Sequence, residues 1–219
     1  MTATWNGITK SEVLGDNETA IRHNLADAAK AYNWNKTLEI LNKRPDLINV
    51  TRPNGRSLYT PFHQAAHGNA PIQVVQQMVA MGGWRTLKNA SCQRPVDIAR
   101  IKAHQQLIEL LEPVYKIYVP YETLASIQKH FHAIIRGRVN DLVEKSGLRL
   151  PELEPLLEIE QPRMWFPVPG MYGGFSYWFN GKGENLKLIS ESWCRVVGGS
   201  GERHEITSKE GKLVDEGFV

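Results

Sequence analysis

The stretch Thr60–Asn69, TPFHQAAHGN, decides how this chain folds, and it raises a choice between a metal site and a structural repeat. His63 and His67 are four residues apart, so on a helix they could share one face and bind a metal ion. No third ligand with a suitable spacing lies nearby, which leaves such a site incomplete. The rest of the chain favours the repeat.

Two further copies of this stretch can be aligned with it. The segment PFHQA at 61–65 aligns with PVDIA at 95–99, an offset of 34 residues, and a fainter copy places Ala28 37 residues before Ala65. Each copy predicts a short inner helix, a tight turn and a longer outer helix with apolar residues at i, i+3 and i+4. The alanines suit the inner helices, because neighbouring helices approach closely only when the side chains between them are small.

These residues resemble the ankyrin repeats. TPFH at 60–63 is close to the TPLH of that family, AAHGN at 65–69 matches its turn, and RPVDIA at 94–99 is similar to the variant of a last repeat. The resemblance covers residues 21–112 and implies about three stacked helix pairs with finger-like loops on one side. It also implies that the protein binds other proteins and that His63 holds its turn by hydrogen bonding, with His67 at a variable surface position.

A repeat array needs its ends covered, and the next segment predicts a helical cap at 113–160. Residues 122–146 form an amphipathic helical pattern, with Gly147 suited to its C-terminal cap and Pro151 to the first turn of a shorter helix. The basic side of the long helix could touch nucleic acid, but its interspersed acidic residues favour a solvated face.

Residues 161–219 predict a small antiparallel β-meander, in which PVPGMYGG at 167–174 forms a shaped loop. The expected fold class is therefore α+β, with ankyrin repeats at 21–112, a helical cap at 113–160 and a β-rich module at 161–219. The predicted strands are GFSYWF, NLKLISESW, CRVVGG, RHEIT and KLVDEGFV.

Composition narrows the class of protein. Hydrophobic residues make up 42% of the chain, no run is long enough to span a membrane, and the first twenty residues lack the features of a signal peptide. Cys92 and Cys194 form no CxxC pair, so free thiols in the cytoplasm are expected. Of the formal charge of +3, residues 21–112 carry an excess of +6, which predicts an acidic partner for that segment.

The positive charge gathers in the two expected finger loops, residues 49–58 and 83–94, which contain no Asp or Glu. A solvated basic rim is one interpretation. The other is a partner-binding surface, favoured by a tryptophan that we expect to be exposed beside arginines, as in an interface hot spot. The predicted partner-binding residues are Arg52, Arg56, Trp84, Arg85, Lys88 and Arg94.

The β-rich module offers a second candidate site. Cys194 and His204 could form a nucleophile and base, and GGSG at 198–201 could cradle a phosphate, although a hairpin turn explains the glycines better. The surrounding segment 192–207 also resembles an element of uncharacterised bacterial proteins. The residues that we expect to serve any ligand there are Trp193, Arg195, Ser200 and His204.

Two classes of function remain open. The first is a non-enzymatic protein-binding protein, a bacterial inhibitor of the immunity or antitoxin type, which grips an acidic protein with its fingers. The alternative is an enzyme or small-ligand binder with its site in the β-rich module. No residue set combines a nucleophile, a base and an orienting group, so binding is favoured, with no metal, cofactor, membrane or nucleic acid as partner.

Overall fold

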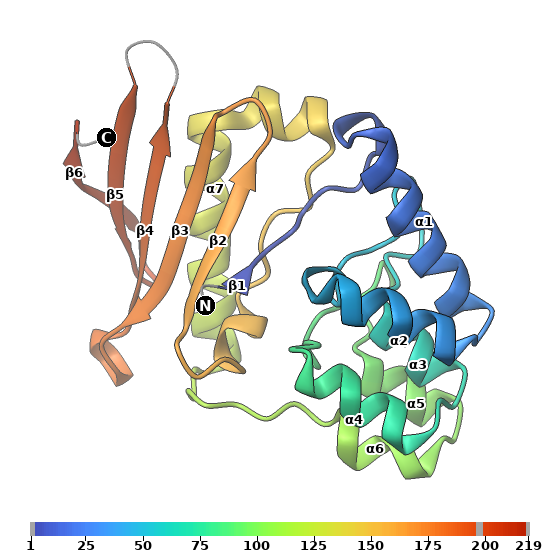
Figure 1. Ribbon diagram of the computed structural model, residues 1–219. Helices are drawn as coiled ribbons and strands as arrows, with labels where there is room; N and C mark the ends of the chain where they lie inside the picture. The colour runs from blue at the N-terminus through green and yellow to red at the C-terminus, as the bar shows by residue number, and fades with distance from the viewer. Residues whose placement is uncertain (1–2, 196–198, 218–219) are drawn as a thin grey trace. The chain divides into compact units, whose positions relative to one another are not determined.

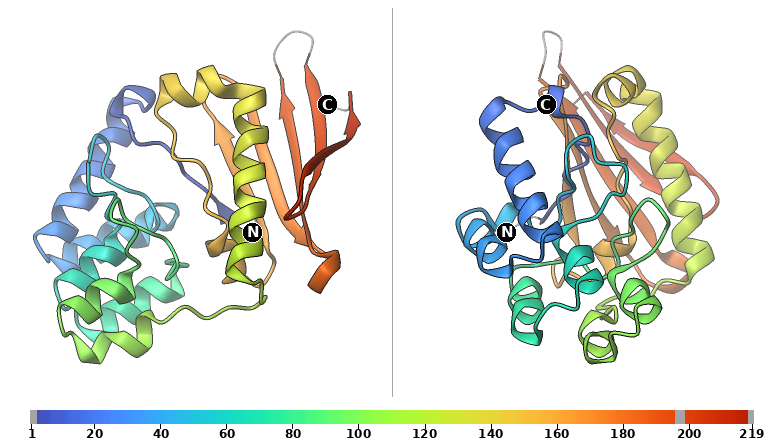
Figure 2. Two further views of the ribbon diagram at one scale, coloured as in Figure 1. Left: turned by 180° about the vertical axis from the view of Figure 1, so that it is seen from behind. Right: turned by 90° about the vertical axis from the view of Figure 1, so that its right-hand side faces the viewer.

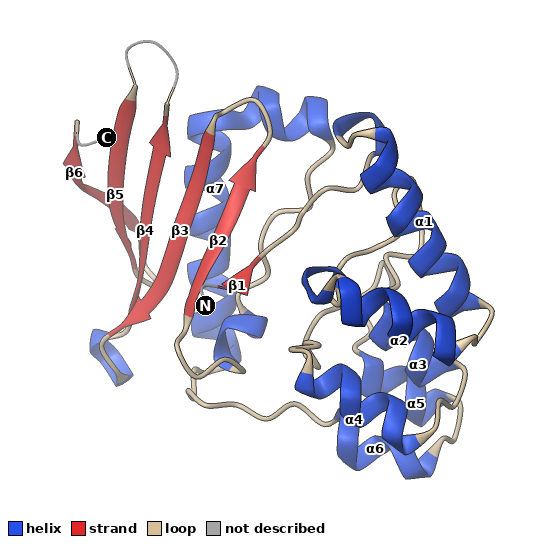
Figure 3. Cartoon of the chain, viewed as in Figure 1, coloured by secondary structure: helices blue, strands red, loops and turns tan. Residues whose placement is uncertain are grey.

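The computed structural model describes residues 3–195 and 199–217 (Figure 1). The chain forms two compact units. A helical unit comprises Ile8–Val114, and a sheet unit comprises the described residues before Ile8 and from Tyr115 onward. Helices and a mostly antiparallel sheet confirm the predicted α+β class (Figure 3). None of the helices in the described ranges has both the length and the apolar character needed to cross a membrane.

The helical unit consists of three helix pairs, and its core is formed by the apolar sides of these helices. The inner helices contact one another along the series, α1 with α3 and α3 with α5. The pairs are α1 (Asp16–Lys30) with α2 (Trp34–Lys43), α3 (Pro61–His67) with α4 (Ile72–Ala80), and α5 (Pro95–Ile101) with α6 (Gln105–Leu111). Short 3₁₀ turns lie at Ser11–Val13 (η1) and Pro45–Leu47 (η2).

The predicted offsets of 37 and 34 residues recur in the backbone of the turns within the pairs. Each turn contains one residue in the left-handed region, and these residues are Tyr32, Asn69 and Ala103, with φ of 57°, 48° and 56°. Each turn also closes with a bond from an amide to the carbonyl of a repeat alanine: Asn33 to Ala28 (2.9 Å), Ala70 to Ala65 (3.0 Å) and His104 to Ala99 (2.9 Å). The three alanines are at most 9% exposed, as close helix contact requires.

The start of α3 explains the first histidine of TPFHQAAHGN. Thr60 and His63 form a capping box, in which the Thr60 backbone N–H donates to His63 Nδ1 (3.3 Å) and the His63 backbone N–H donates to Thr60 Oγ1 (3.3 Å). Nδ1 is therefore an acceptor, and Nε2 can donate to the Gln93 carbonyl at 3.3 Å. The expected role of His63 in holding the turn is confirmed.

The sheet unit contains six strands in the order β1-β2-β3-β4-β5-β6 (Figure 2). Neighbouring strands are antiparallel except for β1 and β2, which are parallel. The strands are β1 (Ala3–Thr4), β2 (Arg163–Val168), β3 (Gly173–Asn180), β4 (Lys187–Cys194), β5 (Ser200–Ile206) and β6 (Gly211–Glu216), with a 3₁₀ turn η4 (Gly183–Asn185) before β4.

One face of the sheet is covered by the long helix α7 (Tyr121–Ser146) (Figure 2). The Phe131 ring lies 4.9 Å from the Tyr177 ring and 6.4 Å from the Phe175 ring, measured between centroids. The sequence assigned this helix to covering the repeats, whereas its buried side chains pack on the sheet. The helix ends at Gly147 in the left-handed conformation (φ 55°), as predicted, and it is interrupted at Val139, where φ is −144°.

Some sequence predictions for the sheet unit were wrong. The short helix after α7 is a 3₁₀ turn, η3 (Glu154–Leu157), so Pro155 rather than Pro151 occupies the first turn. Strand β2 was missed because Pro167 interrupts its pattern. Proline is tolerated there because β1 pairs only with Met164 and Trp165, which leaves Pro167 without a neighbour on that side.

The segment CRVVGG, predicted as a separate strand, is only partly described. Cys194 ends β4, Arg195 and Gly199 are in loops, and residues 196–198 lie outside the described residues, as do residues 218–219 of KLVDEGFV. The hairpin-turn interpretation of GGSG therefore concerns a segment that is only partly described.

Candidate functional site

The first finger loop places its two arginines differently. Arg52 forms an ion pair with Asp27 of α1, with both side chains substantially exposed. Arg56 is exposed and makes no hydrogen bond or ion pair with any described residue. Of the six predicted partner-binding residues, these two line a common pocket.

The second finger loop differs from the prediction. Trp84 is only 7% exposed, so the expectation of an exposed tryptophan was wrong. Its backbone N–H donates to Asn49 Oδ1 (2.9 Å), and Asn49 Nδ2 donates to the Gly82 carbonyl (2.9 Å). These two hydrogen bonds tie the backbone at Gly82 and Trp84 to the Asn49 side chain. Trp84 is therefore a buried side chain and not an exposed member of a binding surface.

The remaining basic residues of this loop are partly buried and are engaged in interactions of their own. Arg85 Nε donates to the Leu110 carbonyl at 2.8 Å, which fixes the guanidinium against the end of α6. The Arg94 backbone N–H donates to Asp97 in the capping box of α5, and Lys88 also has an interaction of its own. None of these three residues lines the pocket.

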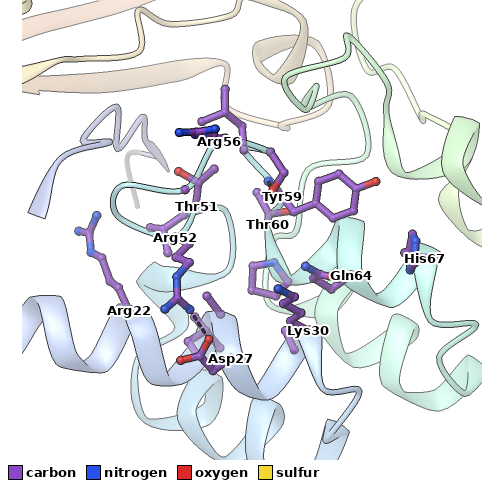
Figure 4. Close-up of a pocket in the computed structure, with 18 of the residues that line it drawn as sticks. Arg22, Asp27, Lys30, Thr51, Arg52, Arg56, Tyr59, Thr60, Gln64 and His67 are labelled. Carbon is purple, nitrogen blue, oxygen red and sulfur yellow. Dashed lines mark hydrogen bonds and ion pairs between the residues drawn. The ribbon is translucent and has the colours of Figure 1, made fainter.

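The pocket has a volume of about 690 Å³, within the range of small-ligand sites (Figure 4). Its walls come from one side of α1, the loop from Val50 to Thr60, and α3 along its whole length. These segments are brought together by the stacking of α1 on α3, which positions the first finger loop over both helices.

The charged side chains that line the pocket are four cations and one carboxylate: Arg22, Lys30, Arg52, Arg56 and Asp27. Arg22 is 4% exposed and donates to Glu18 (2.8 Å), so its charge is balanced within α1. Lys30 is exposed, and like Arg56 it makes no hydrogen bond or ion pair within the described residues. The pocket therefore has two cations available to an anionic ligand.

An aromatic group forms one end of the pocket. The Tyr32 hydroxyl lies 2.7 Å from His67 Nδ1, and the Tyr59 ring lies edge-on to the His67 ring at a centroid distance of 6.2 Å. Burial lowers the pKa of His67 below its ordinary value, and the nearby Lys102 and His104 lower it further. This shift favours the neutral form of His67, which offers a polar, uncharged surface.

Sequence reasoning missed the contribution of the inner helices to this pocket. Lys30, Gln64 and His67 of these helices, and Tyr59 of the loop, were not among the predicted partner-binding residues. Asp27 and Lys30 are three residues apart on α1, and Gln64 and His67 are three apart on α3, so each pair shares a helix face. This spacing was the sequence signal for a shared polar face on each helix. It did not show that Arg52 and Arg56 of the loop line the same pocket.

The second candidate site, in the sheet unit, is divided between the two faces of the sheet. Trp193 lies on the face opposite α7 and stacks on Trp165 with 4.7 Å between ring centroids. Ser200 and His204 lie on the face that α7 covers, since the His204 partner Ser190 pairs with Tyr177. Arg195 is exposed beyond the end of β4. The four predicted ligand-binding residues therefore do not form one site.

The proposed nucleophile and base are also separated. Cys194 is opposite Ser200, and His204 is opposite Ser190, so three residue pairs along the strands lie between the thiol and the imidazole. The neighbour of His204 is Glu202, whose carboxylate is 4.0 Å from Nε2. This arrangement gives the Cys194 thiol no base.

A polar cluster missed by sequence reasoning lies between α7 and strands β4 and β5. Arg138 forms an ion pair with Glu202 and donates through Nη2 to the Ser200 carbonyl (2.8 Å). Arg138 Nε and the hydroxyls of Ser190 and Ser192 are buried without a hydrogen-bond partner among the described residues. Unpaired buried donors of this kind are costly, and ordered water molecules commonly satisfy them.

The partly buried histidine of this cluster, His204, predicts a pH dependence. Burial lowers the pKa of His204 below 6.5, Glu202 opposes this shift and Arg138 adds to it. The unfolded chain therefore binds a proton more readily, so the free energy of unfolding of the sheet unit should fall as the pH drops below about 6.5. The slope that one histidine adds is at most about 1.4 kcal/mol per pH unit.

Native-state hydrogen exchange of the β4 and β5 amides between pH 7.5 and 5.5 measures this dependence. The His204→Gln variant should show a shallower fall, with the remaining slope coming from His132, whose pKa burial also lowers. Equal slopes in the two proteins would contradict the role of His204.

Comparisons with known proteins add no relative: no protein-family model matches the chain, and no curated protein sequence matches it. Among the described residues, no group of three or more His, Cys, Asp or Glu side chains is arranged to hold a metal ion. The pocket of the helical unit is thus the candidate functional site with the best-defined geometry.

Proposed function

We propose that the helical unit is an ankyrin-type stack and that the protein is a non-enzymatic binding protein, an inhibitor of the immunity or antitoxin type, directed at an acidic partner protein. The observation that carries this proposal is the pocket beneath the first finger loop, with its excess of positive charge and its two unengaged cations. The recurrent turns and the capped inner helix support the ankyrin resemblance.

The alternative, a catalytic or small-ligand site in the β-rich module, receives less support. Its residues are split between two faces of the sheet, and Cys194 has no base beside it. Both cysteines are free, which suits a reducing compartment, so the cytoplasm is the proposed location.

The proposal is tested by retention of a partner from a native bacterial lysate. We expect Arg52→Glu combined with Arg56→Glu to slow association and flatten its dependence on salt, because charges at an interface steer the encounter. Mass spectrometry identifies the retained protein, and stopped-flow kinetics with the purified partner measure the association rate.

A charge reversal elsewhere serves as the control. Lys129 is exposed on α7 in the other unit, so Lys129→Glu should leave association unchanged. Normal association of the double arginine variant would move the interface away from the first finger loop and reject the proposal.

A further inference from the structure

A carboxylate of the protein itself already lies in the pocket, and it indicates which chemical group the pocket can bind. Asp27 of α1 pairs with Arg52 of the loop, with side-chain exposures of 59% and 41%. An ion pair this exposed contributes little stability, so another carboxylate can compete for Arg52. Asp27 thus occupies, within the protein itself, a position that an acidic side chain of a ligand can take.

The free cations are arranged for more than one carboxylate. Figure 4 shows Arg56 at the upper end of the pocket, Arg52 directed down at Asp27, and Lys30 on the other side of the lower part. The three cationic groups do not converge on one point, as they would around a single phosphate. Separate carboxylates on successive residues of an extended segment match this spread, and guanidinium groups bind carboxylates with two parallel hydrogen bonds.

The uncharged walls suit a peptide. The Gln64 amide can donate to a backbone carbonyl and accept from a backbone N–H, and the Tyr59 ring offers a surface for the methylene groups of an acidic side chain. The volume of about 690 Å³ holds a ligand of the size of a few residues.

We infer that this pocket binds an acidic peptide segment of the partner, one of whose carboxylates displaces Asp27 from Arg52 while others pair with Lys30 and Arg56. This inference rests on the proposed function and specifies the ligand of the same site. Asp27 then acts as an internal competitor, and this role makes an unusual prediction: removal of the Asp27 charge strengthens binding.

The test uses a fluorescein-labelled, N-acetylated hexaglutamate peptide and fluorescence anisotropy at low ionic strength. Lys30→Ala combined with Arg56→Ala should lower the association constant by about tenfold, because both free cations are lost. Asp27→Asn should raise it about threefold, because Arg52 becomes available to the peptide.

Two matched variants separate the pocket from a general effect of net charge. Lys129→Ala removes one exposed cation and Glu109→Gln removes one exposed carboxylate, both outside the pocket. Neither should change the association constant. If Asp27→Asn binds hexaglutamate no better than Glu109→Gln, or if the Lys30 and Arg56 variant binds as well as Lys129→Ala, the inference is wrong.

Competition experiments distinguish an acidic peptide from other anionic ligands. Unlabelled hexaglutamate should displace the probe at lower concentrations than either a phosphoserine peptide of the same length or a six-nucleotide oligothymidylate; stronger displacement by either of these anions overturns the peptide assignment. If hexaglutamate fails to bind while the double Arg→Glu variant still loses the partner, this inference fails and the proposed function stands.

Discussion

Replacing Trp84 with alanine should lower the free energy of unfolding of the helical unit by about 3 to 5 kcal/mol. The side chain is 7% exposed, and the Asn49 amide clamps the backbone around it. Truncation removes the contacts of a buried indole beside the backbone that Asn49 holds. Urea unfolding, followed by hydrogen exchange of the α3 and α4 amides, measures the loss for this unit separately from the sheet unit.

The matched comparison is Arg56→Ala, which removes an exposed side chain from the first finger loop. That variant should change the free energy of unfolding by no more than about 0.5 kcal/mol. A Trp84→Ala protein that unfolds like the wild type, and differs only in faster release of a partner, would restore Trp84 to the binding surface and contradict its burial.

The second large effect is expected at Trp5. This side chain is 2% exposed, its Nε1 donates to the Arg149 carbonyl (2.9 Å), and the Arg149 guanidinium lies 5.4 Å from the ring centroid. Its backbone N–H continues the pairing of β1 by donating to the Trp165 carbonyl (2.8 Å). Trp5→Ala should therefore destabilise the sheet unit by about 3 to 5 kcal/mol.

Hydrogen exchange again provides the measurement, because it reports on each unit. Protection of the β2 and β3 amides should fall in Trp5→Ala, whereas protection in α3 should be unchanged. Tyr118→Ala is the control, since that side chain is 86% exposed. Equal protection in Trp5→Ala and the control would show that Trp5 does not stabilise the sheet.

The repeat was predictable because its signal is local and recurs. The alanine spacing follows from the close approach of helices, and the turn residues follow the same offsets. The pairing of β1 with β2 was not predictable, because two residues carry no periodicity and their partners lie far along the chain. Strand β2 was not predicted because it contains Pro167. Only the sheet shows that the neighbouring strand β1 is too short to reach this proline.

The candidate site was only partly predictable, because its residues come from segments that are separated in the sequence. Charge counting found Arg52 and Arg56, which do line the pocket, but it gave the same weight to Arg85, which is fixed by the Leu110 carbonyl. Composition also suggested that Trp84 was exposed, although tertiary packing buries it. Sequence shows which residues a loop contains, whereas their partners depend on how the loop folds back.

The placement of β1 in the sheet unit has a consequence for the order in which the protein is made. Ala3 pairs with Met164, so 161 residues separate the partners along the chain. At about 5 to 20 residues per second, a ribosome needs roughly 8 to 30 s to supply the second strand after the first. The contiguous segment Ile8–Val114 can fold during this delay, while Trp5 remains exposed to solvent until β2 is available. The helical unit of the nascent chain can thus fold first, and the edge of the sheet that contains β1 and Trp5 can form only after β2 has been made.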